Sequence, residues 1–312
     1  MADPAATVLD VLAERSSGAV FGSLSEVWAA YATERGEGRS PFSAAVRVAA
    51  QCDRLGHAFA VGYPAALEHM IPGVELPCAL CVTEAGGNGP RAIATTLRPA
   101  ARGYQLDGTK TFVTFGTLAK ALIIAARTGD KPDGRPDLAV VRIPAERGGV
   151  ELEELPPTPF VPEVVHARVR LEAVEVRQDE RLPGDGYLRY VKPFRTVEDI
   201  HVLGATLGYV LGWARRAGAE KSLVAELGSD LIALDGLLTF EPLDPRGQVA
   251  LQGVYQHVAA LLAGEAFACL LSAADHVERE RWERDRTLLQ VASKAREARF
   301  DAATQALGAA PA

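Results

Sequence analysis

The hydrophobic pattern divides the chain into three regions. In residues 1–77 apolar positions recur at helical spacing, with Ser23 as the expected cap of a helix that runs to Glu34, and with Pro64 as an expected break. Residues 78–186 read as short strands between turns, and residues 187–312 return to helical spacing. The sequence therefore predicts an α+β chain: a short amino-terminal helical region (1–77), a β-barrel middle domain (78–186) and a carboxyl-terminal helical bundle (187–312).

Turn chemistry separates the expected strands of the middle domain. Asp107-Gly108 is a hairpin signal between strands at 103–106 and 110–115. The alternation from His166 to Leu171 predicts a strand with one solvated face. Further strands are expected near residues 78–84, 91–98, 120–127, 137–143, 150–155 and 163–176.

The carboxyl-terminal region is expected to hold helices at 196–218, 248–281 and 284–307, with a shorter pair in 223–240. The apolar run from Val249 to Ala274 is long enough for a membrane span. It contains two glutamines, a histidine and a glutamate, which favour a buried bundle helix instead. We therefore expect no membrane partner.

Composition and charge limit the partners and the cellular compartment that we expect for the protein. The 312 residues carry a net charge of −7 and a pI near 5.5, so no basic footprint for nucleic acid is present. Four cysteines in a chain of this length do not form a disulfide framework, and the acidic amino terminus lacks the layout of a signal peptide. These features predict a cytoplasmic protein.

Several stretches of the middle domain have a recognisable order and spacing. They are Cys81-Val82-Thr83-Glu84 followed by two glycines, Gly103 to Lys110, and Thr111 to Gly116. Together they resemble the signatures of the acyl-CoA dehydrogenase family, and Gln305 to Gly308 is similar to the end of one of its helices. Family members continue with a further segment, so we expect a short, divergent member that lacks that carboxyl-terminal segment.

The resemblance implies a fold, a cofactor and a substrate. In this family FAD lies between the β domain and the last helical domain, and an acyl thioester lies against its other face. Carried over to this chain, Val82, Thr83, Phe112 and Thr114 become the expected flavin contacts. Each also suits a strand simply because β-branched and aromatic residues fill strands.

The catalytic base is expected to be Glu198. A minority of family members take the base from a helix, ten residues before the second glycine of a G-x-x-L-G run, and Gly204 to Gly208 is that run here. The alternative is a helix start, with Thr196 and Asp199 as a capping box.

Three departures from the family leave catalysis open, one being that the family's adenine-side motif belongs to the carboxyl-terminal segment that we expect to be missing. Asn88-Gly89-Pro90 replaces a family stretch with a hydroxyl near the flavin phosphates, and the R-x-x-F-G motif that reaches a neighbouring subunit's FAD has no counterpart. The sequence therefore supports two functions: α,β-dehydrogenation of an acyl thioester with FAD, or a non-catalytic relative that binds or interacts after losing FAD. In either case the resemblance implies a homodimer or homotetramer.

Three other motifs are weaker evidence of function. Gly87 to Ala92 fits the dinucleotide fingerprint but does not open a helix, and Cys78 and Cys81 form only half of a zinc pattern. The pairs Glu163–His166 and Glu198–His201 would need two helices of one bundle to hold iron, and the first pair reads as strand. We expect no metal.

Overall fold

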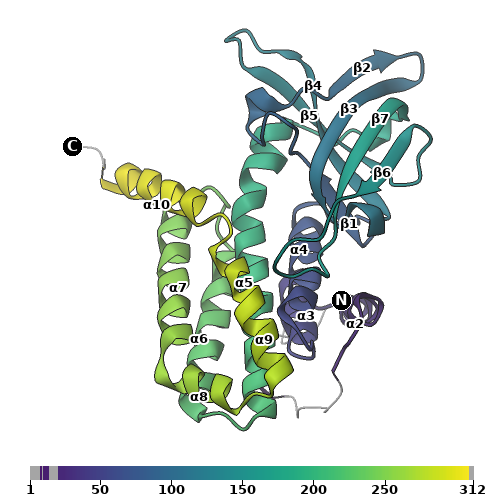
Figure 1. Cartoon of the computed structure of the whole chain (residues 1–312). Helices are drawn as coiled ribbons and strands as arrows, with labels where there is room; N and C mark the ends of the chain where they lie inside the picture. The colour runs from purple at the N-terminus through teal and green to yellow at the C-terminus, as the bar shows by residue number, and fades with distance from the viewer. Residues whose placement is uncertain (1–7, 9, 14–19, 309–312) are drawn as a thin grey trace. The chain divides into compact units, whose positions relative to one another are not determined.

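The computed structural model describes residues 8, 10–13 and 20–308. It forms two compact units: a helical unit from Met1–His69, Pro159–Val161 and Thr196–Ala312, and a sheet unit from Met70–Thr158 and Pro162–Arg195. The predicted α+β class is confirmed, since helical regions precede and follow a curled sheet in the chain (Figure 1). The division into three domains at residues 77 and 186 stays a prediction.

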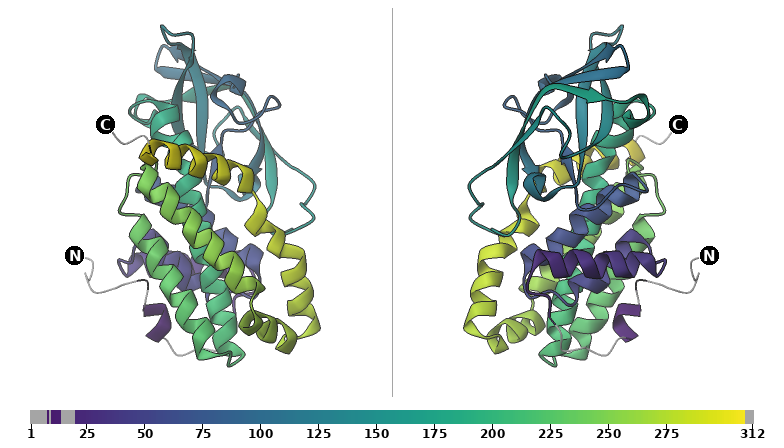
Figure 2. Two further views of the ribbon diagram at one scale, coloured as in Figure 1. Left: turned by 90° about the vertical axis from the view of Figure 1, so that its left-hand side faces the viewer. Right: turned by 90° about the vertical axis from the view of Figure 1, so that its right-hand side faces the viewer.

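Helices account for most of the helical unit. They are α1 (Asp10–Ala13), α2 (Leu24–Gly36), α3 (Pro41–Ala49), α4 (Leu55–Met70), α5 (Lys192–Arg216), α6 (Lys221–Leu237), α7 (Pro245–Ala263), α8 (Glu265–Ala273), α9 (His276–Asp285) and α10 (Ser293–Gly308). Helix α7 packs beside both α6 and α10 (Figure 2). Residues 1–7, 9 and 14–19 of the predicted amino-terminal helical region lie outside the described residues.

The strands of the sheet unit are β1 (Cys78–Cys81), β2 (Thr96–Ala100), β3 (Gly103–Thr114), β4 (Ala121–Asp130), β5 (Pro136–Pro144), β6 (Val150–Glu154) and β7 (His166–Val176). They form one sheet in the order β1-β4-β2-β3-β7-β6, with β5 also paired to β4. Most pairs are antiparallel, while β4 runs parallel to β1 and β2. The side chains on its inner side form a buried apolar core that includes Leu106, Val113 and Val169.

The predicted hairpin at Asp107-Gly108 is wrong, because β3 runs through it without a break. A bulge on the neighbouring strand lies there instead: Leu106 pairs with Val174 but Gly108 pairs with Leu171, and Ala173 has a φ of +49°. The Asp107 carboxylate accepts a 2.8 Å hydrogen bond from the Ala173 amide. The aspartate therefore satisfies a donor that the bulge would otherwise leave without a partner.

A second bulge lies on β3 itself and cancels the first. Lys110 pairs with Val169 and Val113 with Ala167, so Thr111 and Phe112 together occupy the space of one partner residue. Phe112 has a φ of +51°. Because each strand carries one extra residue, the register before the first bulge is restored after the second.

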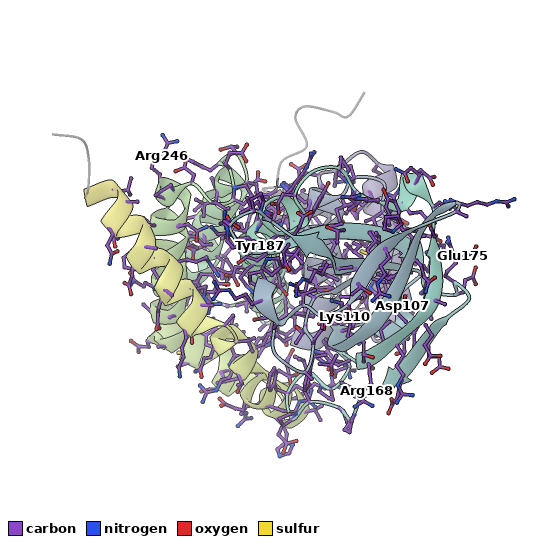
Figure 3. The ribbon with its side chains drawn as sticks, turned by 90° about the horizontal axis from the view of Figure 1, so that it is seen from above. Asp107, Lys110, Arg168, Glu175, Tyr187 and Arg246 are labelled. Atoms are coloured by element: carbon purple, nitrogen blue, oxygen red, sulfur yellow. The ribbon has the colours of Figure 1, made fainter. Side chains whose placement is uncertain are left out.

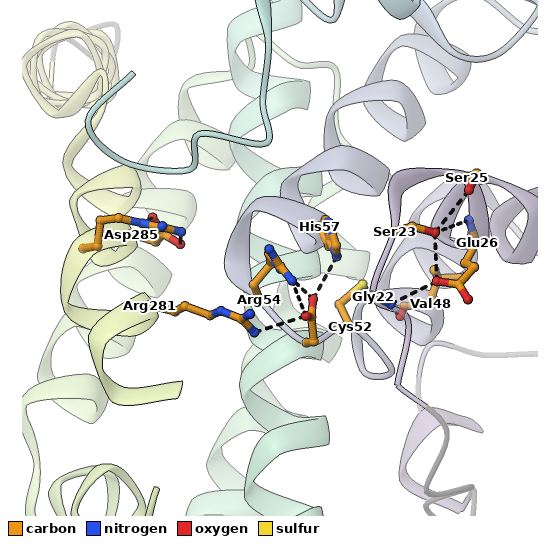
Figure 4. Close-up of polar contacts among 12 residues, drawn as sticks. Gly22, Ser23, Ser25, Glu26, Val48, Cys52, Arg54, His57, Arg281 and Asp285 are labelled. Carbon is orange, nitrogen blue, oxygen red and sulfur yellow. Dashed lines mark hydrogen bonds and ion pairs between the residues drawn. The ribbon is translucent and has the colours of Figure 1, made fainter. Parts of the chain in front are cut away.

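Helix α2 begins as the sequence predicts. Ser23 accepts from the Glu26 amide at 3.4 Å, and the Glu26 carboxylate accepts from the Gly22 amide and from the Ser23 hydroxyl (Figure 4). In the same view Asp53 pairs with Arg54, with His57 at 2.9 Å and with Arg281 at 3.1 Å. This aspartate therefore connects the start of α4 to α9 within the helical unit.

Pro64 does not break the chain as predicted, because it lies inside α4. A proline there removes the amide that would bond the carbonyl four residues earlier, which is that of Ala60. The indole nitrogen of Trp28 donates to the Ala60 carbonyl at 2.8 Å. A side chain from α2 thus supplies the donor that Pro64 lacks.

The expected helix at 248–281 is also wrong, since the structure divides it into α7, α8 and α9. Gly264 separates α7 from α8, and Asp275 caps α9 by accepting from the Glu278 amide at 2.8 Å. Residues 223–240 hold one helix, α6, rather than a pair. Apolar content alone hid these breaks, because neither a lone glycine nor one aspartate interrupts the hydrophobic pattern.

Among the residues that the structure describes, no single helix is both long and apolar enough to cross a membrane. Helices α7 and α8 reach that length and composition only together, and they meet at a bend of 53°.

Candidate flavin platform and the helix that carries Glu198

The second bulge determines which side chains β3 presents outward. Lys110 and Val113 are both buried, although they are three residues apart in a strand that alternates every second residue. Phe112 and Thr114 consequently both lie on the outward side. The Phe112 side chain is 64% exposed, an unusual state for an aromatic residue, and Thr114 is half-buried.

Val82 and Thr83, in the segment that follows β1, lie against the same part of β3. The Thr111 amide donates to the Thr83 carbonyl at 2.9 Å, and the Lys110 ammonium lies 3.4 Å from the Val82 carbonyl. The structure therefore brings together all four expected flavin contacts, Val82, Thr83, Phe112 and Thr114, which we call the platform.

A buried ion pair holds the platform in place. The Lys110 ammonium is fully buried and donates to Glu84 at 2.6 Å (Lys110 on β3 is labelled in Figure 3). Glu84 also accepts from the amides of Ala94 and Thr95 and from the Thr95 hydroxyl. Burial by itself would raise the pKa of Glu84, but Lys110 and these donors hold that pKa below its ordinary value.

Glu84 and Lys110 both lie within the family-like motifs of the sequence, but the sequence alone assigns neither residue a role. The available signal was a lysine in a strand with apolar neighbours, since a buried lysine requires a carboxylate partner. Gly108 belongs to the same arrangement, because a side chain there would collide with Thr95. The network fixes β1, β3 and the loop at residues 94–95 relative to one another.

The platform offers groups suited to a flat, partly polar ring. Within the described part of the chain, the hydroxyls of Thr83 and Thr114 have no hydrogen-bond partner, and neither is sealed from solvent. Beside them His166 packs its ring edge-on to Phe112, with centroids 6.3 Å apart. An exposed aromatic face next to available hydroxyls fits a ligand with apolar faces and a polar edge.

Glu198 lies on α5 in the helical unit and is half-buried. The predicted capping box at Thr196 and Asp199 is wrong, because α5 begins at Lys192, before either residue. Thr196 instead accepts a 2.8 Å hydrogen bond from Gln248 of α7. Asp199 is buried and forms ion pairs with Arg296 and Arg299 of α10.

The glycine run used to locate Glu198 has a packing role in α5. Side chains at Gly204, Gly208 and Gly212 would collide with Phe42, Val46 and Ala50 of α3 and its end. The glycines therefore allow α5 to lie directly against α3. This contact explains the run without reference to catalysis.

A cavity of about 260 Å³ lies in the helical unit and is lined by three residues of α5, Thr196, Val197 and Ile200. The rest of its lining comes from His69 and from residues 237–242 and 247. At about 100° of rotation per residue, Glu198 points to the opposite side of α5. The structure therefore does not place Glu198 in this cavity.

The sequence by itself matches no family model and no curated protein. Solved structures are nevertheless similar over most of the chain. Butyryl-CoA dehydrogenase from Megasphaera elsdenii is 16% identical, with a TM-score of 0.60 over 85% of this chain and 81% of its own. The prolyl acyl carrier protein oxidase AnaB is 17% identical, with a TM-score of 0.62 over 91% and 89% of the two chains. The chain has the acyl-CoA dehydrogenase fold.

Other structures with the acyl-CoA dehydrogenase fold include flavoproteins. FMN-bound TdsC from Paenibacillus sp. A11-2 is 16% identical, with a TM-score of 0.58 over 94% of this chain and 92% of its own. At these identities the likeness establishes the fold alone. The roles of Val82, Thr83, Phe112, Thr114 and Glu198 stay predictions.

The sequence contains three motifs that could be considered for metal binding. Among the described residues, no group of three or more histidines, cysteines and carboxylates could hold a metal ion. Glu163 precedes β7 and His166 begins it, as the sequence indicated. Cys78 and Cys81 are buried in β1, and burial raises the pKa of Cys81 to about 12, so it stays a thiol.

Proposed function

We propose that this protein is a flavin-dependent oxidoreductase that removes hydrogen from the α and β carbons of an acyl thioester. The observation that carries the proposal is the platform, where a bulge turns Phe112 and Thr114 outward beside Thr83. A strand that only filled a sheet would gain nothing by exposing a phenylalanine, since burying that side chain would contribute roughly 1.5–3 kcal/mol. FAD is the flavin that we propose the platform holds.

When bound, the flavin supplies the acceptor for the hydride that leaves the β carbon. The task left to the chain is to remove the α proton, which is weakly acidic and requires a carboxylate base. Glu198 is the candidate, and its neighbour Asp199 is excluded because Arg296 and Arg299 already hold its carboxylate. On the sheet unit, the Thr83 and Thr114 hydroxyls would orient the ring system by hydrogen bonds.

One observation supports a second candidate function, a non-catalytic acyl-binding or interaction protein that has lost FAD. Residues 88–90, which replace the family stretch near the flavin phosphates, form a largely exposed turn that leads into a 3₁₀ helix at Pro90–Ala92 and carry no hydroxyl. Each charge-assisted hydrogen bond missing around the phosphates would weaken binding by about 1.5–3 kcal/mol. The platform would then survive as a binding surface only.

The visible absorbance spectrum of the purified protein decides between the two functions. Incubation with FAD and removal of the excess should leave a flavin spectrum, and an acyl-CoA should bleach it. A colourless protein that takes up no flavin would exclude the oxidoreductase and support the second candidate.

The proposed role of Glu198 is tested with single-residue variants. Glu198→Gln should retain flavin but lose at least 100-fold in the rate of bleaching, in line with about 10²–10⁴-fold from general base catalysis. Glu297→Gln, at an exposed carboxylate on α10, serves as the matched control and should bleach at the normal rate. Normal bleaching by Glu198→Gln would assign the base to another residue.

We further propose that the protein works as a homodimer or homotetramer, as the family resemblance implies. Sedimentation velocity on the full chain tests this, and a monomer at micromolar concentration would contradict it.

A further inference from the structure

His166 lies beside the platform and is the first residue of β7. Its Cα pairs with that of Thr114, and residues directly opposite in an antiparallel pair point to the same face of the sheet. Its ring also meets the Phe112 ring edge-on, at an interplanar angle of 67°. The imidazole therefore borders the outward surface that Phe112 and Thr114 form.

One ring nitrogen of this histidine is not satisfied by the protein. The Nδ1 atom is buried and has no hydrogen-bond partner among the described residues. A buried polar atom without a partner destabilises the protein, and a ligand that supplies the partner removes that cost.

Burial also favours the neutral form of the ring. Burial lowers the pKa of His166 below the usual histidine value, and a hydrogen bond between the ring and the backbone of Val164 offsets only part of this effect. A neutral imidazole has one donor and one acceptor nitrogen. It can therefore pair with an uncharged heteroaromatic edge, which also presents both donors and acceptors.

We propose that His166 is a flavin contact, whose imidazole hydrogen-bonds the heteroatom edge of the isoalloxazine ring held by the platform. This inference rests on the proposed function, and it adds a residue from β7 to contacts that otherwise come from β3 and the segment after β1. In this proposal His166 contacts the ring system of the flavin and not its phosphates. Its loss should consequently weaken every flavin by the same factor, whatever is attached to the ring.

The experiment measures binding of FAD, FMN and riboflavin to the full chain by quenching of flavin fluorescence. His166→Leu should weaken all three by about 5- to 10-fold, the factor expected for one hydrogen bond. It should also shift the visible absorption band of the bound flavin. His166→Gln, whose amide offers a donor and an acceptor, should recover part of the affinity.

Arg170→Leu is the matched control, since Arg170 lies four residues along β7 from His166, opposite Thr109, and its half-exposed side chain pairs with Glu153 at 3.5 Å. It should bind all three flavins within twofold of the unmodified protein. A folded His166→Leu protein with unchanged affinities and spectrum would overturn the inference while leaving the proposed function intact. If the unmodified protein binds none of the three, both fail. If His166→Leu does not fold, His166→Gln and His166→Asn are measured in its place. Unchanged flavin affinity and an unchanged spectrum in both variants would overturn the inference.

Discussion

Each unit of the molecule contains a buried carboxylate that holds its surroundings together, and the two are held differently. Glu84 in the sheet unit accepts hydrogen bonds from Ala94, Thr95 and Lys110, all within 26 residues of it in the chain. Asp199 in the helical unit is paired with Arg296 and Arg299, which are 97 and 100 residues away. Glu84 thus fixes a local arrangement that shapes the platform, whereas Asp199 fixes the packing of α10 on α5.

The difference shows how each region is specified. In the sheet unit the backbone amides of one loop and a single lysine converge on Glu84, so local chain geometry determines the contact. In the helical unit the contact depends on two separate helices meeting in the correct register. Damage to the first should therefore stay near the platform, while damage to the second should loosen a helix–helix interface.

The largest effect is expected from Lys110→Met, which breaks the contact in the sheet unit. The substitution leaves Glu84 buried without its cation, and removing one partner of a buried pair costs about 3–5 kcal/mol. Hydrogen exchange should become faster in β1 and β3, and urea unfolding should move to lower concentration.

Lys120→Met is the control for this prediction, since the Lys120 side chain is 60% exposed and lies 3.7 Å from an equally exposed Glu75. It should change stability by less than about 0.5 kcal/mol. Equal effects from both variants would contradict the role given to Glu84.

Asp199→Asn tests the helical side of the comparison and should cost about 1.5–3 kcal/mol, the range for hydrogen bonds to charged groups. The effect is expected to be smaller than for Lys110 because the Arg299 side chain is 21% exposed and water can replace its partner. All three tryptophans belong to the helical unit, so their fluorescence during urea unfolding reports on it.

Asp301→Asn, an exposed carboxylate on α10, is the matched control and should unfold at the same urea concentration as the unmodified protein. A midpoint for Asp199→Asn that coincides with this control would remove the contrast with Glu84.

Trp28→Phe should cost about 1–3 kcal/mol, toward the lower end, because the Ala60 carbonyl loses the donor that replaces the missing amide of Pro64. Pro64→Ala restores an amide at that position. The same Trp28→Phe change made in Pro64→Ala protein should therefore cost less. A double-mutant cycle from thermal unfolding measures the coupling, and additive effects would show that the two residues act separately.

The smallest effect on stability is expected from the change in the charge of His257 with pH. His257 of α7 bonds to Asp230 of α6 at 2.8 Å and lies 3.6 Å from Glu226, and the hydrogen bond to Asp230 raises the pKa of His257. A histidine whose pKa is raised by folding stabilises the folded state most below its unfolded pKa of about 6.5. That contribution is lost as the pH rises through the higher folded pKa.

His257→Gln should therefore destabilise the protein by a few tenths of a kcal/mol near pH 5.5 and by less near pH 8, since the His257 side chain is 48% exposed and pairs screened by solvent contribute about 0.2–1 kcal/mol. Thermal unfolding at the two pH values measures the difference. A larger loss near pH 8 would reverse the assigned sign.

The comparison also explains what the sequence could and could not predict. Val82, Thr83, Phe112 and Thr114 could be proposed as flavin contacts because their motifs are continuous stretches whose order and spacing are visible in the sequence. The partners of Asp199 could not be found, because an arginine about a hundred residues away gives no local signal. Asp107-Gly108 was misread because a glycine after an aspartate suits a hairpin and a bulge equally, and only the pairing of β3 with β7 distinguishes them.

Pro64 was misread for a related reason. A proline normally ends a helix, and the indole of Trp28 that compensates for it comes from another helix. The prediction failed where tertiary contact outweighed local preference. His166 was considered only as a metal ligand, since its position opposite Thr114 depends on strand register.

The paired bulges of β3 and β7 act on the sheet as two opposite frameshifts act on a reading frame. Between them, residues 108–110 pair one position out of step, and outside them the original frame holds. A deletion of one residue at Thr111 or Phe112 would remove the second of these shifts, with Lys110 still opposite Val169 and Val113 still opposite Ala167. Any redesign that transfers this surface to another sheet must carry the bulge at Thr111 and Phe112, because regular alternation from Lys110 onward would put Thr114 in the core and Val113 in water.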